Sequence, residues 1–342
     1  MTISPTTDES VALTPPLPEK RRRSGKNIAL LILSRYGTLI GLVAMIIVFT
    51  IKSPYTFFTI GNFSNILSQS SLTAIIAAGL TMTLVVGEFD LSIGYVASFA
   101  GLLVVGFIAQ NGIPVLVGVP LILLIGAVIG TANGLLVTKV RINAVIATLG
   151  VGTILTGIGF AYSAFPIAAN VPPLFLQLSL GSVVFGIPNS IIIMLVVLAI
   201  LWVILNKTDL GQKMQAVGGN IEAARLSGLR VDRIKIFAFA TAGVCAALTG
   251  VLLSSLLGSG TLAAADGYLL DAFAAVFLGS ATIRDGEFHI VGTLVGVLVI
   301  AVGFNGLSIF GAPTFVQPIF KGGVLILAVG LSTLSRRYSK AA

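Results

Sequence analysis

Long apolar runs dominate the sequence and restrict what the chain can fold into. A helix crosses a bilayer core about 30 Å thick with roughly 20 apolar residues. Ten suitable runs follow one another, at residues 36–51, 66–86, 91–109, 115–137, 142–164, 189–205, 236–257, 267–281, 289–310 and 319–334. Hydrophobic residues make up 56% of the 342 residues and charged residues 9%, which excludes a soluble globular domain. We therefore predict an all-α, polytopic membrane protein with about ten transmembrane helices.

The basic residues predict the orientation of these spans. With the N-terminus inside, eighteen of the twenty Lys and Arg residues fall in cytoplasmic segments, and Lys52 and Lys321 fall outside. Cytoplasmic loops of membrane proteins carry such an excess. We therefore expect an even number of spans with both termini in the cytoplasm. The net charge of +8 then faces anionic lipid rather than nucleic acid.

The chain divides into a tail and a membrane domain. Residues 1–27 are rich in Pro, Thr and Ser and lack the apolar core of a cleaved signal peptide, so we expect a disordered cytoplasmic tail. Residues 28–338 form the predicted transmembrane domain, which residues 206–235 interrupt as a long polar loop. An uncharged, proline-rich stretch at residues 165–188 separates the fifth and sixth spans.

The sequence contains no constellation for catalysis or metal binding. It has no H-E-x-x-H, no G-x-S-x-G and no phosphate-binding G-x-x-x-x-G-K-[ST]. The single Cys245 and the single His289 have no companions at metal-ligand spacing. We expect no catalytic residue, metal or cofactor in this chain. If ATP and magnesium drive its activity, a separate subunit must bind them.

Two carboxylates and two glycines interrupt the second and third spans, in Gly87-Glu88-Phe89-Asp90-Leu91-Ser92-Ile93-Gly94. Acidic residues beside membrane spans are costly and mark functional sites. The segment is either a broken helix that lines a translocation path or a tight cytoplasmic turn. We expect a structural or gating role for Asp90 and Ser92, because the unperturbed Asp pKa of about 3.9 lies outside pH 5 to 8. Gly-Glu-Phe recurs at residues 286–288, as an internal repeat or by chance.

A short amphipathic helix is predicted within the polar loop, at residues 216–228. Asn220 suits its N-cap, Glu222 complements the positive end of the helix dipole, and Gly228 can adopt the left-handed conformation that ends a helix. The preceding Gly218-Gly219 predicts an adjustable hinge. The helix suits a groove on a partner protein or, alternatively, a lipid surface. The apolar residues available for docking are Ile221, Ala224 and Leu226.

Several motifs, in their order and spacing, resemble the permease subunits of ribose/xylose/galactoside-type ABC sugar importers. Residues 218–235, with Glu222-Ala223-Ala224-x-x-x-Gly228, resemble the start of the cytoplasmic coupling motif. Residues 87–94 resemble the Gly-x-x-Asp-Leu-Ser-x-Gly signature. Further matches are Asn133-Gly134-Leu135, Ala147-Thr148-Leu149-Gly150, Gly186-Ile187-Pro188, Asp271-Ala272 and Asn305-Gly306-Leu307. The resemblance covers residues 58–329, although Leu269 replaces a common Glu and weakens any assignment of a particular sugar.

The resemblance implies a permease that translocates a monosaccharide, such as ribose, across the bacterial inner membrane. It implies three partners: an ABC ATPase that binds ATP and Mg, a periplasmic sugar-binding protein, and a second permease chain in a homodimer. The residues assigned to ATPase coupling are Gly219, Asn220, Glu222, Ala223, Ala224, Arg225 and Gly228. The polar residues assigned to the translocation path or its gating are Gln69, Asp90, Ser92, Asn133, Asn143, Asp271 and Asn305. Such residues also serve as helix–helix hydrogen-bonding groups.

Three other classes are compatible with parts of the sequence. A permease of the same superfamily for a branched-chain amino acid or a nucleoside would share these motifs. An ion-driven secondary transporter needs a titratable group within the membrane, and Glu88 with Asp90 is the only suitable set. A membrane enzyme would need a catalytic group set, which the sequence lacks.

Overall fold

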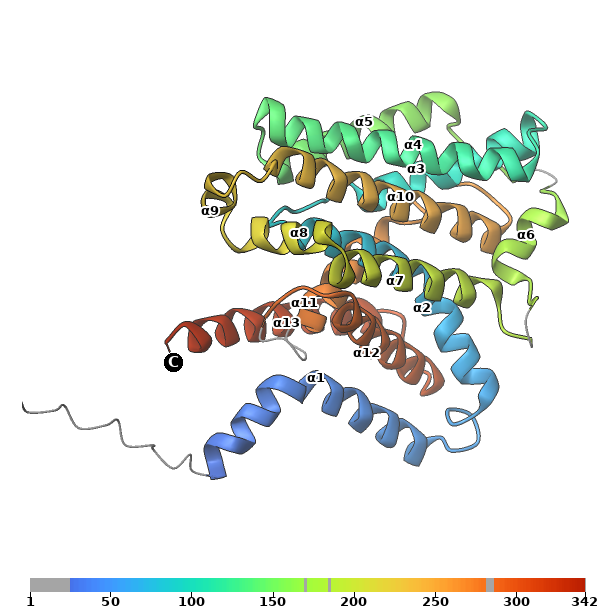
Figure 1. Cartoon of the computed structure of the whole chain (residues 1–342). Helices are drawn as coiled ribbons and strands as arrows, with labels where there is room; N and C mark the ends of the chain where they lie inside the picture. Colours follow the sequence, from blue (N-terminus) through green and yellow to red (C-terminus); the bar gives the residue numbers. More distant parts are fainter. Residues whose placement is uncertain (1–24, 169–170, 184–185, 281–285, 342) are drawn as a thin grey trace, which may run out of the picture.

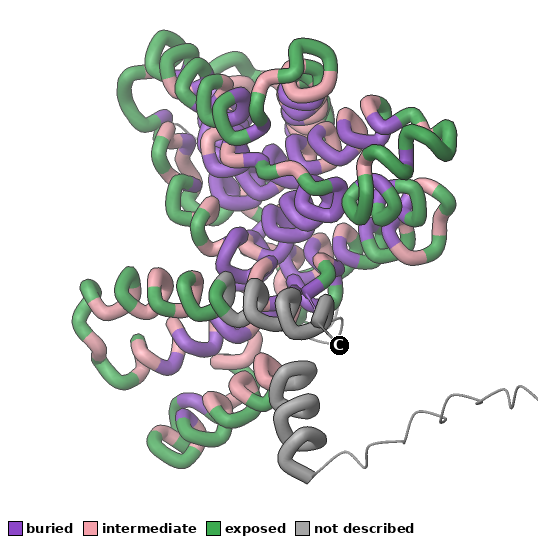
Figure 2. Tube along the Cα trace, turned by 90° about the vertical axis from the view of Figure 1, so that its left-hand side faces the viewer, coloured by how far each residue is buried: buried purple, intermediate pink, exposed green. Residues whose placement is uncertain are grey.

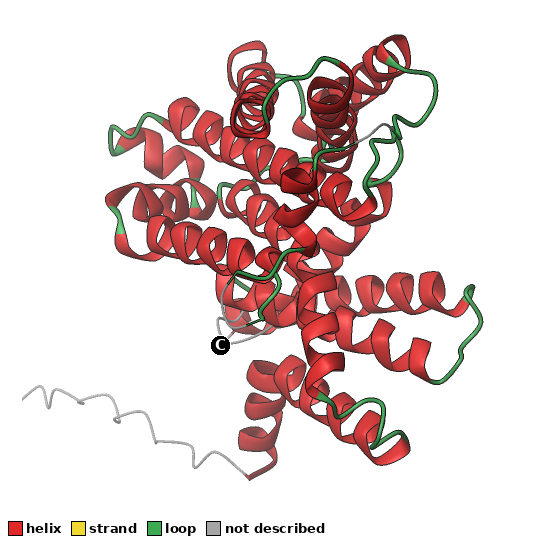
Figure 3. Cartoon of the chain, turned by 90° about the vertical axis from the view of Figure 1, so that its right-hand side faces the viewer, coloured by secondary structure: helices red, strands yellow, loops and turns green. Residues whose placement is uncertain are grey.

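A computed structural model of the chain shows a bundle of helices (Figure 1). The structure describes residues 25–168, 171–183, 186–280 and 286–341. The predicted tail at residues 1–27 therefore lies outside the described residues except for its last three, which begin the first helix. Figure 3 shows helices joined by loops with no strand among the described residues, and an isolated bridge pairs Ile167 with Gly260. The all-α prediction is confirmed.

Ten helices coincide with the ten predicted apolar runs. They are α1 (Gly25–Lys52), α2 (Ile60–Val85), α3 (Ile93–Val105), α4 (Val115–Leu135), α5 (Ala144–Tyr162), α7 (Asn189–Lys207), α10 (Val231–Leu257), α11 (Asp266–Ser280), α12 (Ile290–Ile309) and α13 (Val316–Ala341). The π-helical turns η1 (Gly106–Gln110) and η2 (Leu136–Val140) extend α3 and α4. Within the described residues, α2, α3 with η1, α4 with η2, α5, α7, α10 and α12 are long and apolar enough to cross a membrane. The chain is thus a multi-pass membrane protein.

Three short helices lie outside the ten apolar runs, and the last two meet at Asn220, inside the stretch predicted as one helix at residues 216–228. They are α6 (Pro173–Leu180), α8 (Asp209–Gly219) and α9 (Ile221–Leu226). The first begins within the proline-rich stretch because proline at the first helical position lacks only an N–H that would be unpaired there. Thr208 caps α8 by accepting a hydrogen bond from the amide of Gly211 at 3.3 Å. The polar loop predicted at residues 206–235 is therefore mostly helical.

Helix α10 runs through the middle of the bundle and packs against α2, α3 and α4 (Figure 1). Small residues allow this close approach. A Cβ atom added at Gly126 of α4 would lie 2.6 Å from the carbonyl oxygen of Gly243, and one at Gly134 would lie 2.7 Å from the Cα of Ile236. The tight packing predicted from Gly126-x-x-x-Gly130-x-x-x-Gly134 is confirmed, with α10 as the partner.

Burial separates two groups of helices (Figure 2). Most of α2, α3 and α10 is buried inside the bundle, whereas most of α4, α5 and α7 is not. Apolar side chains that are exposed on long spans face the hydrocarbon of the membrane. The exposed helices α4, α5 and α7 therefore carry most of the surface toward lipid.

Candidate functional site

The predicted coupling residues form a short helix that is capped at both ends. Asn220 begins α9, and its side-chain oxygen accepts a hydrogen bond from the amide of Ala223 at 3.0 Å. Gly228 follows the helix with φ +78°, and its amide donates to the carbonyl of Arg225 at 2.9 Å. Both the N-cap and the left-handed stop are confirmed. Two caps matter because a six-residue helix is not stable in water by itself.

The surface that α9 offers to a partner differs from the prediction. Leu226 is 90% exposed and Ile221 is partly buried, but Ala224 is buried against the bundle and is unavailable for docking. Glu222 and Arg225, three residues apart, form an exposed ion pair at 3.5 Å. Leu226 and this ion pair are therefore the features of α9 that a partner can reach.

The hinge predicted at Gly218-Gly219 is wrong. Both glycines belong to α8, and a Cβ atom at Gly218 would overlap the carbonyl oxygen of Val85, near the end of α2. Glycine is needed at residue 218 for close backbone contact rather than for flexibility. Met214 and Val217 of α8 are fully buried and hold it against the bundle. Helix α9 is therefore joined, through α8, to the point where the polar Gly87–Gly94 segment begins.

That segment leaves α2 through a well-defined helix end. Gly87 has φ +82° and its amide bonds to the carbonyl of Leu84 at 3.0 Å, while the amide of Glu88 bonds to the carbonyl of Thr83 at 2.9 Å. These two bonds form a Schellman motif. The next helix begins only at Ile93, so residues 86–92 are non-helical. Asp90 is fully buried, whereas Gly87 and Phe89 beside it are exposed, so the segment runs from the surface of the bundle into its interior.

Three of the predicted path residues meet in this segment. The hydroxyl of Ser92 donates to Asp90 Oδ1 at 2.6 Å, and the backbone amide of Ser92 donates to the same oxygen at 2.9 Å. Asn133 of α4 donates from Nδ2 to the Ser92 hydroxyl at 2.8 Å. All three side chains are buried, and the other oxygens, Asp90 Oδ2 and Asn133 Oδ1, have no hydrogen-bond partner among the described residues.

Burial changes the titration of Asp90. Loss of water raises the pKa of this carboxyl to about 6, although the two hydrogen bonds from Ser92 oppose the rise. This pKa lies within pH 5 to 8, and the structural or gating role expected for Asp90 stays a prediction. Its neighbour Glu88 pairs with Lys235 of α10, so the nearest basic side chain already has an anionic partner.

The repeated Gly-Glu-Phe tripeptides occupy similar places. Gly87 has φ +82° and precedes α3, and Gly286 has φ +91° and precedes α12. The ring of Phe89 stacks on that of Phe277 with centroids 6.4 Å apart, and Phe288 meets the same ring edge-on at 5.5 Å. Both phenylalanines therefore pack on the same ring of α11.

The remaining predicted path residues lie elsewhere. Asn305 of α12 and Asn62 of α2 exchange two side-chain hydrogen bonds, at 2.8 and 3.0 Å, which is a helix–helix contact. Asn143 caps α5 by accepting from the amide of Val145 at 2.9 Å, and Gln69 is exposed. Asp271 of α11 forms a 2.6 Å ion pair with Lys321 of α13. The structure thus brings Asp90, Ser92 and Asn133 together, and separates the others from them.

Three side chains that were not predicted as site residues contact the segment Gly87–Gly94. Thr148 of α5 accepts a hydrogen bond from the amide of Leu91 at 3.1 Å, Lys235 pairs with Glu88, and Phe273 stacks on Phe89 with centroids 6.2 Å apart. Thr148 lies in a matched family motif, which was a usable signal. In the sequence, Lys235 is one of the basic residues that predict the orientation of the spans. Nothing in the sequence distinguishes Phe273 from the other phenylalanines.

Comparison with known proteins is consistent with this architecture. A family model described as the permease component of a branched-chain amino acid transport system matches residues 62–329. The ribose import permease of Haemophilus influenzae is 37% identical over 294 residues, which are 85% of this chain and 90% of that protein. The ribose import permease of Bacillus subtilis is 38% identical over 299 residues, 87% of this chain and 92% of the relative. The D-allose transport system permease of Escherichia coli is 32% identical over 300 residues, which are 88% of this chain and 92% of that protein. No solved structure matches the chain.

A multi-pass helical bundle that a permease family model matches over residues 62–329 is the membrane-spanning component of a transport system. Within that class the chain belongs to the permease subunits of the ribose/xylose/galactoside type, as the matched family model and the relatives show.

Proposed function

We propose that this chain is the permease subunit through which a monosaccharide, ribose or a close relative, enters the cell across the inner membrane. The observation that carries the proposal is 37–38% identity to two ribose import permeases over at least 85% of the chain. A separate ATPase supplies the energy, because the sequence has no phosphate-binding loop. A periplasmic binding protein delivers the sugar, and two copies of the chain enclose the path.

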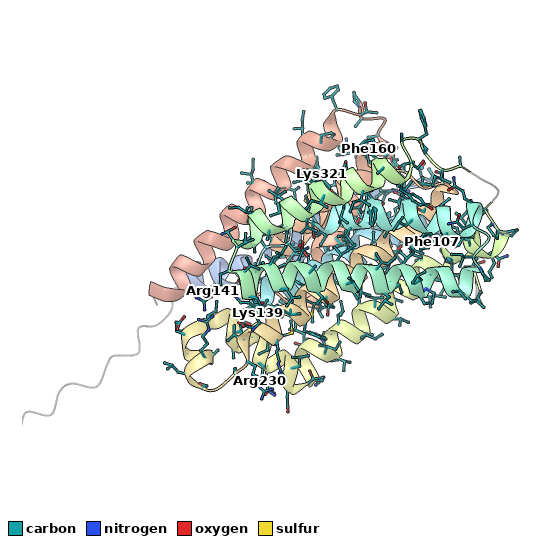
Figure 4. The ribbon with its side chains drawn as sticks, turned by 90° about the horizontal axis from the view of Figure 1, so that it is seen from above. Phe107, Lys139, Arg141, Phe160, Arg230 and Lys321 are labelled. Atoms are coloured by element: carbon teal, nitrogen blue, oxygen red, sulfur yellow. The ribbon has the colours of Figure 1, made fainter. Side chains whose placement is uncertain are left out.

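The end of the bundle that carries α9 faces the cytoplasm in this proposal. Lys139, Arg141 and Arg230 gather there (Figure 4), which supports the orientation by the distribution of basic residues. Lys321, an apparent exception, pairs with Asp271, so it carries no orientation signal of its own.

Coupling runs from α9 through α8 to the polar segment. The ATPase binds α9 and displaces it between two states of its nucleotide cycle. Because Gly218 of α8 lies directly against Val85, the motion reaches the start of residues 86–92 without an intervening flexible loop. Rearrangement of the Asp90–Ser92–Asn133 hydrogen bonds then opens or closes the path. This two-state element is what a coupling mechanism needs.

Reconstitution tests the proposal directly. The chain is placed in liposomes with its ATPase and binding protein, and ATP-dependent uptake of labelled ribose is measured with xylose, allose, leucine and a nucleoside as competitors. The proposal is supported if labelled ribose is taken up and only the sugars among the competitors reduce this uptake. Uptake of leucine or the nucleoside in place of sugar would assign the chain to another branch of the superfamily.

The energy source has its own control. The chain alone, given an imposed proton or sodium gradient, should accumulate no sugar, since a separate ATPase supplies the energy in this proposal. Accumulation driven by a gradient without the ATPase would show a secondary transporter.

A further inference from the structure

Two adjacent cavities at the α9 end of the bundle are lined by basic side chains. Their volumes are about 220 and 310 Å³, and both are lined by Arg225, Val231 and Asp232. They lie between η2, the loop after α9 and the first turn of α10. The basic residues that line one or both, called here the basic cluster, are Lys139, Arg141, Arg225, Arg230, Arg233 and Lys235.

The basic cluster has more positive charge than its neighbours neutralise. Three members have carboxylate partners: Lys139 pairs with Asp232 at 2.8 Å, Arg225 with Glu222, and Lys235 with Glu88. Over the part of the chain that the structure describes, the other three, Arg141, Arg230 and Arg233, make no ion pair. An anion is therefore the chemistry that the cavities are built to accept.

Backbone strain holds one of these arginines in place. Arg141 has φ +64°, and no other non-glycine residue in the described ranges has a positive φ. The left-handed conformation is unfavourable for a residue with a Cβ. The amide of Arg141 ends η2 by donating to the carbonyl of Leu136, and the Arg141 side chain lines the first cavity. Strain maintained by the fold in this way points to a functional position.

An exposed apolar stripe on α4 leads to the cavities. Leu121, Leu124, Val128 and Leu135 are all exposed and are spaced three, four and seven residues apart, so they share one face of the helix. The same spacing leads next to Thr138 and Lys139, which line the cavities. A hydrocarbon-facing surface thus ends directly at an anion-binding one.

We propose that the cavities bind the phosphate headgroup of an anionic phospholipid whose acyl chain lies along the α4 stripe. Basic pockets between the ends of transmembrane helices suit such headgroups. A soluble acidic partner could meet the charges, but it would not reach Val128 and Leu124, which lie within the span. Bound lipid would contact both η2 and the loop after α9, and would so stabilise the position of the coupling helix. The inference requires only that the chain spans the membrane, whatever solute it carries.

Titration of the purified full chain with lipid, read by native mass spectrometry and by melting temperature, tests this. The probes are phosphatidylglycerol, phosphatidylcholine and inorganic phosphate. The test variant is Arg141→Gln/Arg230→Gln, and Arg141→Lys/Arg230→Lys retains the charge. The matched control, Lys207→Gln/Lys213→Gln, removes the same charge near the same end from residues that line neither cavity.

We expect phosphatidylglycerol to bind more tightly than phosphatidylcholine and more weakly as salt rises. The Gln pair should weaken phosphatidylglycerol binding roughly 30-fold, whereas the Lys pair and the control should stay within about 3-fold of the unmodified chain. Equal binding of both lipids, equal loss in the test and control variants, or occupancy by inorganic phosphate alone would overturn the proposal. So would a Gln pair that keeps its lipid but loses the ATPase, because the cluster would then be an acidic partner's surface.

Discussion

Replacing Gly228 with Val separates a coupling role of α9 from a merely surface one. No heavy atom would lie within 4 Å of a Cβ at Gly228, so the substitution causes no clash and its cost comes from the backbone at φ +78°. A side chain in the left-handed region costs about 1–2 kcal/mol, with a β-branched residue at the upper end. At 1.4 kcal/mol per factor of ten, the population of correctly ended α9 falls about 5- to 30-fold.

This loss stays local. The free energy of unfolding of a protein is about 5–15 kcal/mol, so Gly228→Val should leave the chain in the membrane at near-normal amount. Co-purification of the ATPase should weaken and transport should be abolished. Glu222→Lys should act in the same way, since it breaks the pair with Arg225 and places a cation at the positive end of α9.

Two matched controls define the refuting result. Gly112 also has a positive φ, +67°, with open space around it, but it lies before α4 at the opposite end from η2, so Gly112→Val carries the same strain away from α9. Asp209→Lys reverses an acidic residue in the first turn of α8 rather than of α9. If the Gly228 and Glu222 variants bind the ATPase and transport as well as these controls do, α9 is only a surface helix.

Three further predictions concern other sites. A reporter that is active only in the periplasm should give no signal when fused to the C-terminus, and a clear signal would contradict the in/in topology. The pKa of Asp90, raised to about 6, lets the folded state keep a proton that the unfolded state has lost, so stability falls as pH rises from 3.8 through 6. Between pH 5 and 7.5 the loss is about 1.4 kcal/mol, and a melting-temperature series should show it in the unmodified chain and not in Asp90→Asn. Lys321→Met leaves the partly buried Asp271 without its partner and should cost about 1–3 kcal/mol, whereas Asp271→Leu/Lys321→Met should recover most of the lost melting temperature; equal loss in both would show that the ion pair is unimportant.

Features that depend on local composition could be predicted from the sequence. The ten apolar runs correspond to ten helices, and within the described residues seven of them have the length and apolar character that membrane thickness requires of a span. The ends of α9 were predictable for the same reason, since Asn220 and Gly228 act through hydrogen bonds to residues within a few positions. The family resemblance likewise needed only the order of motifs.

Which of the predicted residues contact one another depends on the tertiary structure. Asn133 joins Asp90 and Ser92 because the packing of the bundle brings positions 41 residues apart to 2.8 Å, whereas Asn305, an equally polar residue within a span, pairs with Asn62 instead. Gly218 resembled a hinge in the sequence and is a contact with Val85 in the fold. A residue type states which bonds a side chain can make, but which partner it meets, and how much water that partner's surroundings exclude, depend on the packing of distant helices.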